Sequence, residues 1–331
     1  MYKNYLHDSD KYVYPLTIHE KKKDRTIITY RNNEYGESLR KFHEHYLDII
    51  TKAFPSSHLS YAYKSGFRTY DAVIDHIDSI LFIKLDIASF FESINYGLFE
   101  KKIKAVSPTF DCQDLRYCFY NNHLSLGYVT SPKISDMYLY GFDTQIEKYL
   151  SEHKNLRYSR YCDDILLSTK DGTLDDLHEF YSFIETQLSR FDLTVNDKKV
   201  REFDLNKDTS ASFLGLNIVK KENDNIITVS KKLILETLSH YDKYYEYKKK
   251  YDELKKTLKE RNYYKRHNKL EFDDPYVIET NELYNKLRKI KNRIIYEGSA
   301  SESCRNYIMN NSKVSYMRFL KKYKNKFGYD F

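Results

Sequence analysis

The sequence predicts an α+β protein whose larger part builds a split βαβ, or ferredoxin-like, sheet. Between residues 80 and 200 the apolar patterns indicate strand, helix, strand, strand, helix and strand, which is the βαββαβ order of that plan. Residues 80–87 (ILFIKLDI) form the most strand-like stretch, and two strands at residues 156–169 flank the acidic turn YCDD. From residue 231 onward the sequence is predominantly helical and rich in lysine and tyrosine.

The elements before this sheet are predicted from local signals. A basic turn at residues 21–25 precedes a β-prone run at residues 26–30, and an amphipathic helix then extends to Pro55. A basic and aromatic loop at residues 61–68 leads into a short helix that ends near His76. We interpret His76 as a packed or surface histidine rather than a metal ligand.

Within the predicted sheet domain, a buried strand ends at Asp86 and is followed by a helical region at about residues 97–121. A turn at residues 126–132 opens the next helix, with Pro132 in its first turn. After the YCDD hairpin we expect a helix at residues 174–191, a strand at 193–195 and a further hairpin at about 212–229. Right-handed crossovers place the first strand beside the YCDD hairpin. Asp86 and Asp163 should therefore lie side by side although 77 positions separate them.

Charge is unevenly distributed along the chain. The 331 residues include 55 Lys plus Arg and 48 Asp plus Glu, for a net charge of +7. Residues 231–331 contain 25 basic and 14 acidic side chains and carry +11, which leaves −4 for the rest. This asymmetry indicates a basic C-terminal module that meets a polyanion. The alternative is a solvated, lysine-rich helical face.

Cysteine spacing and hydropathy suggest the compartment. The four cysteines form no CxxC pair, and no apolar run reaches the ~20 residues that cross a bilayer. We therefore expect a soluble, reduced, cytoplasmic protein with no structural zinc and no membrane partner. The cysteines are Cys112, Cys118, Cys162 and Cys304.

Adjacent carboxylates on neighbouring strands suit one chemistry in particular. Oxygen ligands without nearby Cys or His favour Mg²⁺, with Mn²⁺ as a substitute. Two such ions about 4 Å apart support nucleotidyl transfer from a triphosphate to a 3′-hydroxyl. The alternative is that Asp163 and Asp164 only form the turn, where Asp is a favoured residue.

Seven short motifs occur in an order that resembles the reverse transcriptases, and most closely the bacterial group of retron, group II intron and defence-associated enzymes. They lie at residues 23–27 (KDRTI), 64–68 (KSGFR), 85–94 (LDIASFFESI), 127–132 (GYVTSP), 161–164 (YCDD), 196–199 (NDKK) and 213–215 (FLG). The resemblance covers about residues 15–225 and implies a right-hand polymerase. Its parts would be fingers (1–79), a βαββαβ palm (80–230) with the helical insertion and the 212–229 primer-grip hairpin, and a basic helical thumb (231–331).

The resemblance also implies roles for individual residues. The catalytic residues would be Asp86, Asp163 and Asp164, with the Ile87 backbone carbonyl as a further metal ligand. Nucleotide contacts would come from Arg25, Ala88, Phe91, Gly127, Ser131 and Lys199. Template or primer contacts would come from Lys64, Arg68, Phe213, Leu214, Gly215, Tyr263, Tyr264, Lys265 and Arg266. Phe91 matches the aromatic gate that favours dNTPs.

Several of these assignments have competitors. One of Phe90 and Phe91 should be a core residue, Arg25 could be a solvated loop arginine, and Lys198 is as basic as Lys199 one position away. The aromatic and basic C-terminal segment suits phosphate neutralisation and base stacking, or a bundle packed by tyrosines with solvated lysines.

Two departures from the family pattern refine the functional prediction. Leu126 stands where the family usually has Gln, and Phe213-Leu214-Gly215 replaces the Val-Thr-Gly of retrons. We therefore favour a compact defence-associated enzyme that copies a structured non-coding RNA into DNA from dNTPs and a primer. The alternatives are a template-independent or protein-primed polymerase and a catalytically idle RNA-binding scaffold. An effector protein, a second reverse transcriptase and a second copy of the chain are the further partners considered.

Overall fold

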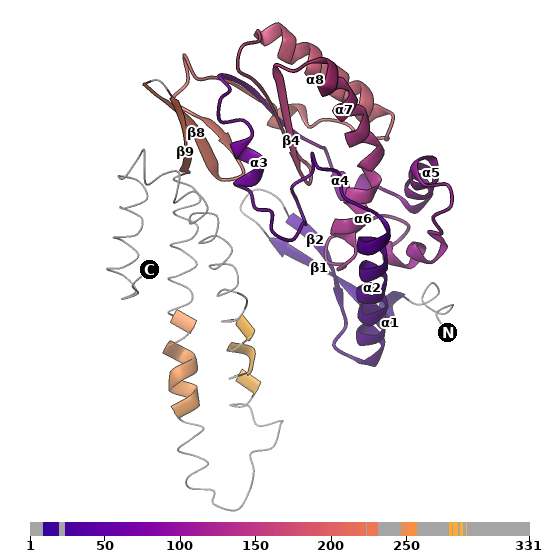
Figure 1. Ribbon diagram of the computed structural model, residues 1–331. Coiled ribbons are helices and arrows are strands. Elements are labelled where there is room, and N and C mark those ends of the chain that lie inside the picture. Colours follow the sequence, from indigo (N-terminus) through magenta and orange to yellow (C-terminus); the bar gives the residue numbers. More distant parts are fainter. Residues whose placement is uncertain are drawn as a thin grey trace, which may run out of the picture. The chain divides into compact units, whose positions relative to one another are not determined.

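The computed structural model describes residues 9–19, 24–222 and 224–230, together with residues 246, 247, 249–256, 278, 279, 281–283, 285, 286 and 289. The chain divides into two compact units, Met1–Asp208 and Thr209–Phe331 (Figure 1). The first unit contains a four-stranded and a two-stranded sheet, and the second contains a three-stranded sheet. The described residues from 246 onward are helical. No helix within the described part of the chain has the length and apolarity needed to span a bilayer.

A four-stranded antiparallel sheet organises the first unit. Its strands are β3 (Leu81–Asp86), β4 (Leu156–Tyr161), β5 (Asp164–Thr169) and β6 (Arg201–Asp204). Their order is β4-β5-β3-β6, so β3 pairs antiparallel with both β5 and β6. A βαββαβ chain with right-handed crossovers gives this order. The predicted position of the first strand, beside the hairpin, is confirmed.

The fourth strand was predicted at the wrong place. Residues 193–195 contribute one isolated bridge, between Val195 and Ile87, and the strand itself is β6 at Arg201–Asp204. Strand β3 ends at Asp86, and Ile87 already lies beyond it. Residues 193–195 therefore have no strand beside them with which to form a longer ladder. The chain then makes the 3-10 turn η2 (Asp197–Lys199) before Arg201 pairs with Lys84.

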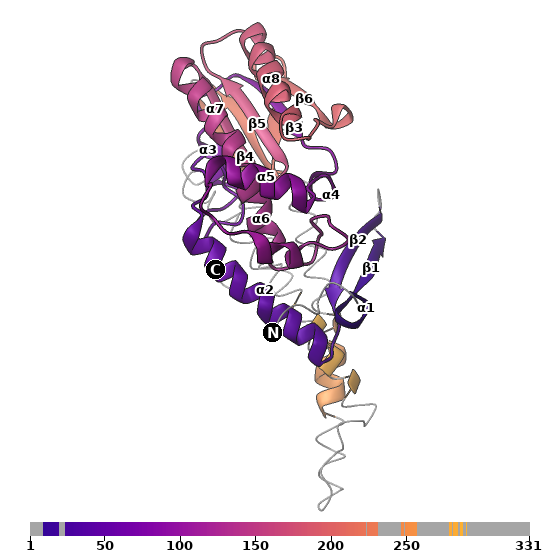
Figure 2. The ribbon, with the colours of Figure 1, turned by 90° about the vertical axis from the view of Figure 1, so that its right-hand side faces the viewer.

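Helices cover one face of this sheet. Helix α8 (Leu174–Ser189) packs on β3 and β5 and lies beside α7 (Tyr140–Glu152) (Figure 2). Ile83 and Leu85 of β3 belong to the same buried cluster as the apolar residues of α8. Because side chains alternate along a strand, Lys84 and Asp86 lie on the opposite face.

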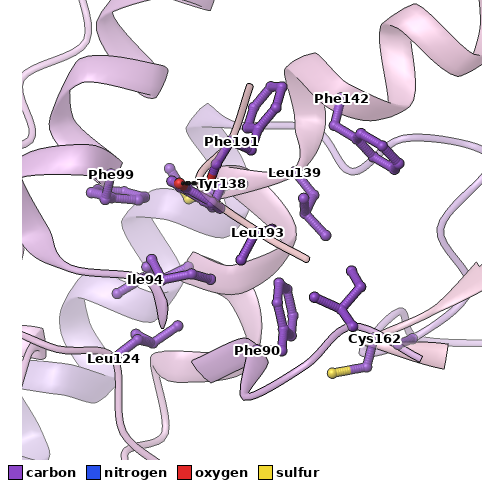
Figure 3. Packing of buried hydrophobic residues seen from close by; sticks show 14 of the residues in the cluster. Phe90, Ile94, Phe99, Leu124, Tyr138, Leu139, Phe142, Cys162, Phe191 and Leu193 are labelled. Atoms are coloured by element: carbon purple, nitrogen blue, oxygen red, sulfur yellow. Dashed lines mark hydrogen bonds between the residues drawn. The ribbon is translucent and has the colours of Figure 1, made fainter. Parts of the chain in front are cut away.

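The core continues from the sheet into α5 (Tyr96–Val106) and α6 (Ser131–Tyr138). Figure 3 shows Phe99, Tyr138 and Phe142 gathered around the segment that carries Phe191. Cys162, in the turn between β4 and β5, belongs to the same cluster and is 7% exposed. The acidic turn is thus attached to the hydrophobic core. The remaining short helices of this unit are α3 (Asp71–Ile74), α4 (Phe90–Ser93) and the 3-10 helix η1 (Gln113–Cys118).

The N-terminal part of the first unit combines a β-ribbon with a long helix. After α1 (Ser9–Tyr12), strands β1 (Val13–His19) and β2 (Asp24–Tyr30) pair antiparallel. Helix α2 (Glu34–Ala53) is capped at its N-terminus by Asn33, whose side chain accepts a hydrogen bond from the Gly36 N–H. An N-cap of this kind satisfies a donor that the helix leaves unpaired.

The three-stranded sheet of the second unit corrects the predicted hairpin at residues 212–229. Its strands are β7 (Ala211–Phe213), β8 (Leu216–Lys221) and β9 (Asp224–Val229), in the order β7-β8-β9. The first predicted strand is interrupted because Leu214 and Gly215 have φ values of 51° and 82°. Two positive φ values in a two-residue loop are typical of a type I′ turn, so Phe213-Leu214-Gly215 forms the corner between β7 and β8.

His76 ties the segment after α3 to the sheet. Its ring nitrogens hydrogen-bond to the hydroxyls of Ser168 on β5 (2.6 Å) and Ser159 on β4 (3.0 Å). The side chain is fully buried, and burial lowers the pKa of His76 to about 3. The ring is therefore neutral, and the interpretation of His76 as a packed histidine is confirmed.

Acidification should weaken the fold through His76. Its unfolded pKa is about 6.5, above the folded value, so the unfolded state takes up the proton first as pH falls. Stability that is complete above pH 6.5 is lost toward pH 3, at about 1.4 kcal/mol per pH unit. Urea unfolding should show that the stability difference between wild type and His76→Gln shrinks by about 2 kcal/mol between pH 7.5 and pH 5. His45→Gln, at an exposed position of α2, is the control. A difference that does not change with pH would contradict the neutral, buried assignment.

Candidate active site

The turn between β4 and β5 presents two acids at its tip. Tyr161 pairs with Asp164 across the hairpin, which leaves Cys162 and Asp163 as a two-residue loop. Cys162 has a φ of 61°, the sign that the first residue of a type II′ turn requires. A side chain with a Cβ is strained at this angle, so the surrounding contacts must hold the turn.

Asp86 lies directly beside this turn. It is opposite Asp164 in the β3–β5 ladder, and the Ile87 N–H donates a hydrogen bond to the Asp163 carbonyl oxygen at 2.9 Å. Directly opposed residues of an antiparallel pair have their Cβ atoms about 5 Å apart on one face. The predicted meeting of Asp86 with the hairpin acids is confirmed.

The three acids create an excess of negative charge in a partly buried place. The pKa of Asp163 is raised, first by burial and then by the like charges of Asp164 and Asp86. Two lysines partly balance this charge. Lys199 Nζ lies 2.8 and 2.7 Å from the two carboxylate oxygens of Asp86, and Lys84 Nζ lies 3.2 Å from Asp164 Oδ1.

The donor set suits a hard divalent cation. The groups are all oxygens, as Mg²⁺ prefers, and their mutual repulsion is what a bound cation relieves. Within the described residues, no three Asp, Glu, His or Cys side chains are already arranged as a metal cage. Lys199 and Lys84 contact two of the three carboxylates. Binding of a metal ion therefore requires side chains to move, whereas the strands can stay in place.

The turn that carries Gly127 is fixed against β2. The Leu126 carbonyl accepts a hydrogen bond from the Ile28 N–H at 2.8 Å. A Cβ at residue 127 would lie 2.2 Å from the Ile28 carbonyl oxygen, and Gly127 has a φ of 107°. Only glycine fits this close approach. The same strand carries Arg25, at an exposed position opposite Ile18.

The other residues predicted to contact nucleotide differ in exposure. Phe90 is 3% exposed and belongs to the core, whereas Phe91 is half-buried, so the expectation that one of the pair is a core residue is confirmed. Ala88 is also half-buried. Ser131 is 1% exposed, and its hydroxyl donates to the Ser125 carbonyl, which favours a role in shaping the loop.

A buried ion network below the acidic turn was missed by the sequence reasoning. Arg160 is 1% exposed and pairs with Asp143 and Asp136, at 2.5 and 3.2 Å from its Nη2. Its Nη1 also donates to the Cys162 carbonyl at 3.3 Å. Arg160 therefore links helices α6 and α7 to the strained residue of the turn. From the sequence alone, an arginine near the end of a strand is expected to be exposed. Only the pairing register of β4 shows that Arg160 is buried.

The basic loop predicted to contact template lies against the same turn. The Tyr61 N–H donates to the Arg160 carbonyl at 2.9 Å, and the Tyr63 hydroxyl donates to Cys162 Sγ at 2.9 Å. Lys64 is half-buried and donates to the Ser57 carbonyl, whereas Arg68 is exposed. The basic character of this loop was predicted from the sequence, whereas the hydrogen bond from Tyr63 to Cys162 was not.

The remaining predicted contacts are in the second unit. Phe213, Leu214 and Gly215 form the β7–β8 corner described above. Tyr263, Tyr264, Lys265 and Arg266 lie outside the described residues.

Comparisons with known proteins agree with this geometry. The model of the family described as reverse transcriptase (RNA-dependent DNA polymerase) matches residues 21–218. The retron Ec83 reverse transcriptase of Escherichia coli is 30% identical over 154 residues, which cover 42% of this chain and 48% of that protein. The retron Ec48 reverse transcriptase of the same organism is 28% identical over 132 residues, 39% of this chain and 32% of that protein. The matched stretches thus span less than half of each relative.

Solved structures show a similar fold. A telomerase from Candida albicans in complex with a telomeric RNA fragment has a TM-score of 0.51 at 13% identity and covers 69% of this chain and 50% of that one. The telomerase of Candida tropicalis with its RNA fragment has a TM-score of 0.50 at 12% identity and covers 96% of this chain and 57% of that one. At these identities the likeness concerns the fold alone.

Loss of the buried arginine should destabilise the protein strongly. Arg160→Met leaves Asp143 buried without its ion-pair partner and leaves Asp136 with only Lys133 as a nearby cation, and breaking a buried pair in this way costs about 3–5 kcal/mol. Urea unfolding followed by circular dichroism measures the change. Arg157→Met, an exposed position of the same strand, should change stability by less than about 0.5 kcal/mol. Equal effects of the two substitutions would contradict the proposed support of the turn.

Proposed function

The chain belongs to the reverse transcriptase (RNA-dependent DNA polymerase) family, and we propose that it is an RNA-directed DNA polymerase that adds dNTPs to a primer 3′-hydroxyl. The observation that carries this proposal is the meeting of Asp86 with Asp163 and Asp164 on one edge of the sheet. Acids on adjacent strands are what two-metal nucleotidyl transfer requires of a protein.

The acids have distinct places in this mechanism. Asp86 and Asp163 would hold the divalent ions, with the Ile87 carbonyl as an added ligand and Asp164 as a supporting charge. Bound Mg²⁺ supplies the activation of the 3′-hydroxyl and the neutralisation of the triphosphate. The β3–β5 ladder holds Asp86 and Asp164 in register, so little reorganisation of the backbone accompanies the reaction.

Further residues would orient the nucleotide. Arg25, on the exposed β-ribbon, would hold the triphosphate, and half-buried Phe91 would exclude a ribose 2′-hydroxyl. Gly127 lets the backbone of its turn approach β2, which brings this turn and the Arg25 strand together. Lys199 contacts Asp86 and is therefore favoured over Lys198 as the phosphate contact or general acid.

We propose the division into fingers (1–79), palm (80–230) and thumb (231–331) on this basis. The four-stranded sheet would be the palm, and the β-ribbon with α2 would belong to the fingers. Lys64, Arg68 and the β7–β8 corner would contact template or primer. The basic segment that contains Tyr263, Tyr264, Lys265 and Arg266 would grip a structured RNA through phosphates and unpaired bases.

The biological setting is proposed from the resemblance alone. A compact bacterial defence enzyme that copies a non-coding RNA, alone or with an effector protein, a second polymerase or a second copy, fits the motifs discussed above. Leu126, in place of the family's usual Gln, motivates one alternative, a polymerase with relaxed template dependence. The Leu126 backbone carbonyl still accepts the hydrogen bond from β2. Replacement of Gln by Leu therefore affects only the contacts that the Gln side chain would make.

Incorporation of labelled dNTPs tests the proposed function. Product is expected only when RNA is added; product without RNA that stays attached to protein would indicate protein priming. Asp163→Asn should abolish incorporation, because a metal ligand is lost, while RNA binding and the melting temperature are retained. Asp171→Asn, an exposed acid at the other end of β5, is the matched control. Full activity of Asp163→Asn would contradict the site.

RNA binding should depend strongly on salt. Contacts between basic residues and phosphates release counterions, so the affinity should fall by roughly 10³-fold between ~50 and ~200 mM salt if roughly six phosphates are neutralised. Fluorescence anisotropy with a labelled structured RNA measures this slope. An affinity that does not change across this range would contradict binding through the RNA backbone.

A further inference from the structure

The acids of the site are paired with two lysines that differ in how firmly they are held. Lys84 lies on the acid-bearing face of β3, two residues before Asp86, and its ammonium is 3.2 Å from Asp164. Lys199 lies on the turn η2, and its ammonium contacts both carboxylate oxygens of Asp86. The mechanism described above uses Lys199 as a phosphate contact or general acid and assigns Lys84 no role.

Lys84 is fixed by its surroundings. It lies on a strand paired on both sides, opposite Leu166 of β5 and Arg201 of β6. Its side chain is 26% exposed and that of Asp164 is 29% exposed, so both partners of this ion pair are largely withdrawn from water. Releasing the ammonium would leave the carboxylate partly buried without a partner, which is unfavourable.

Lys199 is easily released by comparison. Its side chain is 59% exposed, whereas that of Asp86 is 8% exposed. Because the Lys199 ammonium is exposed, water can solvate it as soon as another cation takes its place on Asp86. Asp86, in contrast, needs a cation or a donor in any state in which it is ionised. Asn196 Nδ2 gives only a long hydrogen bond to it, at 3.4 Å.

We propose that Lys199 occupies the cation position on Asp86 in the metal-free protein and is displaced when a divalent ion binds, whereas Lys84 stays on Asp164 in both states. This inference rests on the proposed polymerase function. Asp86 then exchanges its lysine for the ion, Asp163 joins it as a ligand, and Asp164 is kept in place by its lysine. The same displacement frees the Lys199 ammonium for the phosphate of an incoming nucleotide.

Binding of Mn²⁺ to the full chain, without nucleic acid, tests the displacement. Free Mn²⁺ is measured by electron paramagnetic resonance for wild type, Lys199→Met and Lys41→Met. Lys41 pairs with Glu37 on α2, so its substitution removes the same charge and an ion pair at a remote place. Lys199→Met should bind Mn²⁺ about tenfold more tightly than wild type, because a competing positive charge at contact distance is gone. An affinity no higher than that of Lys41→Met would overturn the proposal.

Residue-resolved amine labelling distinguishes the two lysines. With an acetylating reagent and mass spectrometry, Lys199 should become more reactive when Mn²⁺ is added, whereas Lys84 should stay protected with and without the ion. In Asp163→Asn, Mn²⁺ should leave the labelling of Lys199 unchanged. Labelling of Lys84 that rises on Mn²⁺ addition would overturn its assignment as the permanent partner. Neither measurement requires catalysis, so a failed displacement test with intact dNTP incorporation would refute this inference and not the proposed function.

Discussion

The pairing register between β3 and β5 determines which acidic side chains lie together at the edge of the sheet. With Asp86 opposite Asp164, and the Ile87 N–H on the Asp163 carbonyl, acids far apart in sequence share one face. A slip of one residue would turn Asp86 toward the helices, because neighbouring strand residues face opposite sides. The apolar partners Leu85 and Ile165, both fully buried, oppose such a slip, since they would be turned out of the core. Burial of these apolar side chains thus holds the carboxylates close together, although their like charges repel one another.

The charges around this edge form two layers. On the face of the sheet that carries Asp86, Lys84 and Lys199 contact the acids that the family resemblance assigns to metal binding. On the helix-covered face, Arg160 and its buried aspartates hold the Cys162 carbonyl in the strained turn. In the first layer, Lys199 is the member that we propose to exchange with cations from solvent. The second layer cannot exchange, because its charges are buried, and it therefore keeps the turn in one conformation while the first layer changes.

Much of this arrangement was predictable from sequence, and the failures have physical causes. The strand order and the neighbourhood of Asp86 and Asp163 followed from periodicity and crossover handedness, which act over the whole domain. Residues 193–195 have strand composition but lie past the end of their partner strand, which composition cannot reveal. The β7–β8 corner depends on positive φ at Leu214, an unusual angle for that residue. Arg160 and Lys84 could not be found in advance, since their roles come from cross-strand register.

Anomalous scattering from Mn²⁺ in crystals of the protein with primer, template and a non-hydrolysable dNTP tests the assignment of this site most directly. We expect at least one ion bound at the same time by carboxylate oxygens of Asp86 and Asp163, at about 2.0–2.3 Å. An ion bound by one of these acids alone, or anomalous peaks located only away from the β3–β5 edge, would contradict it.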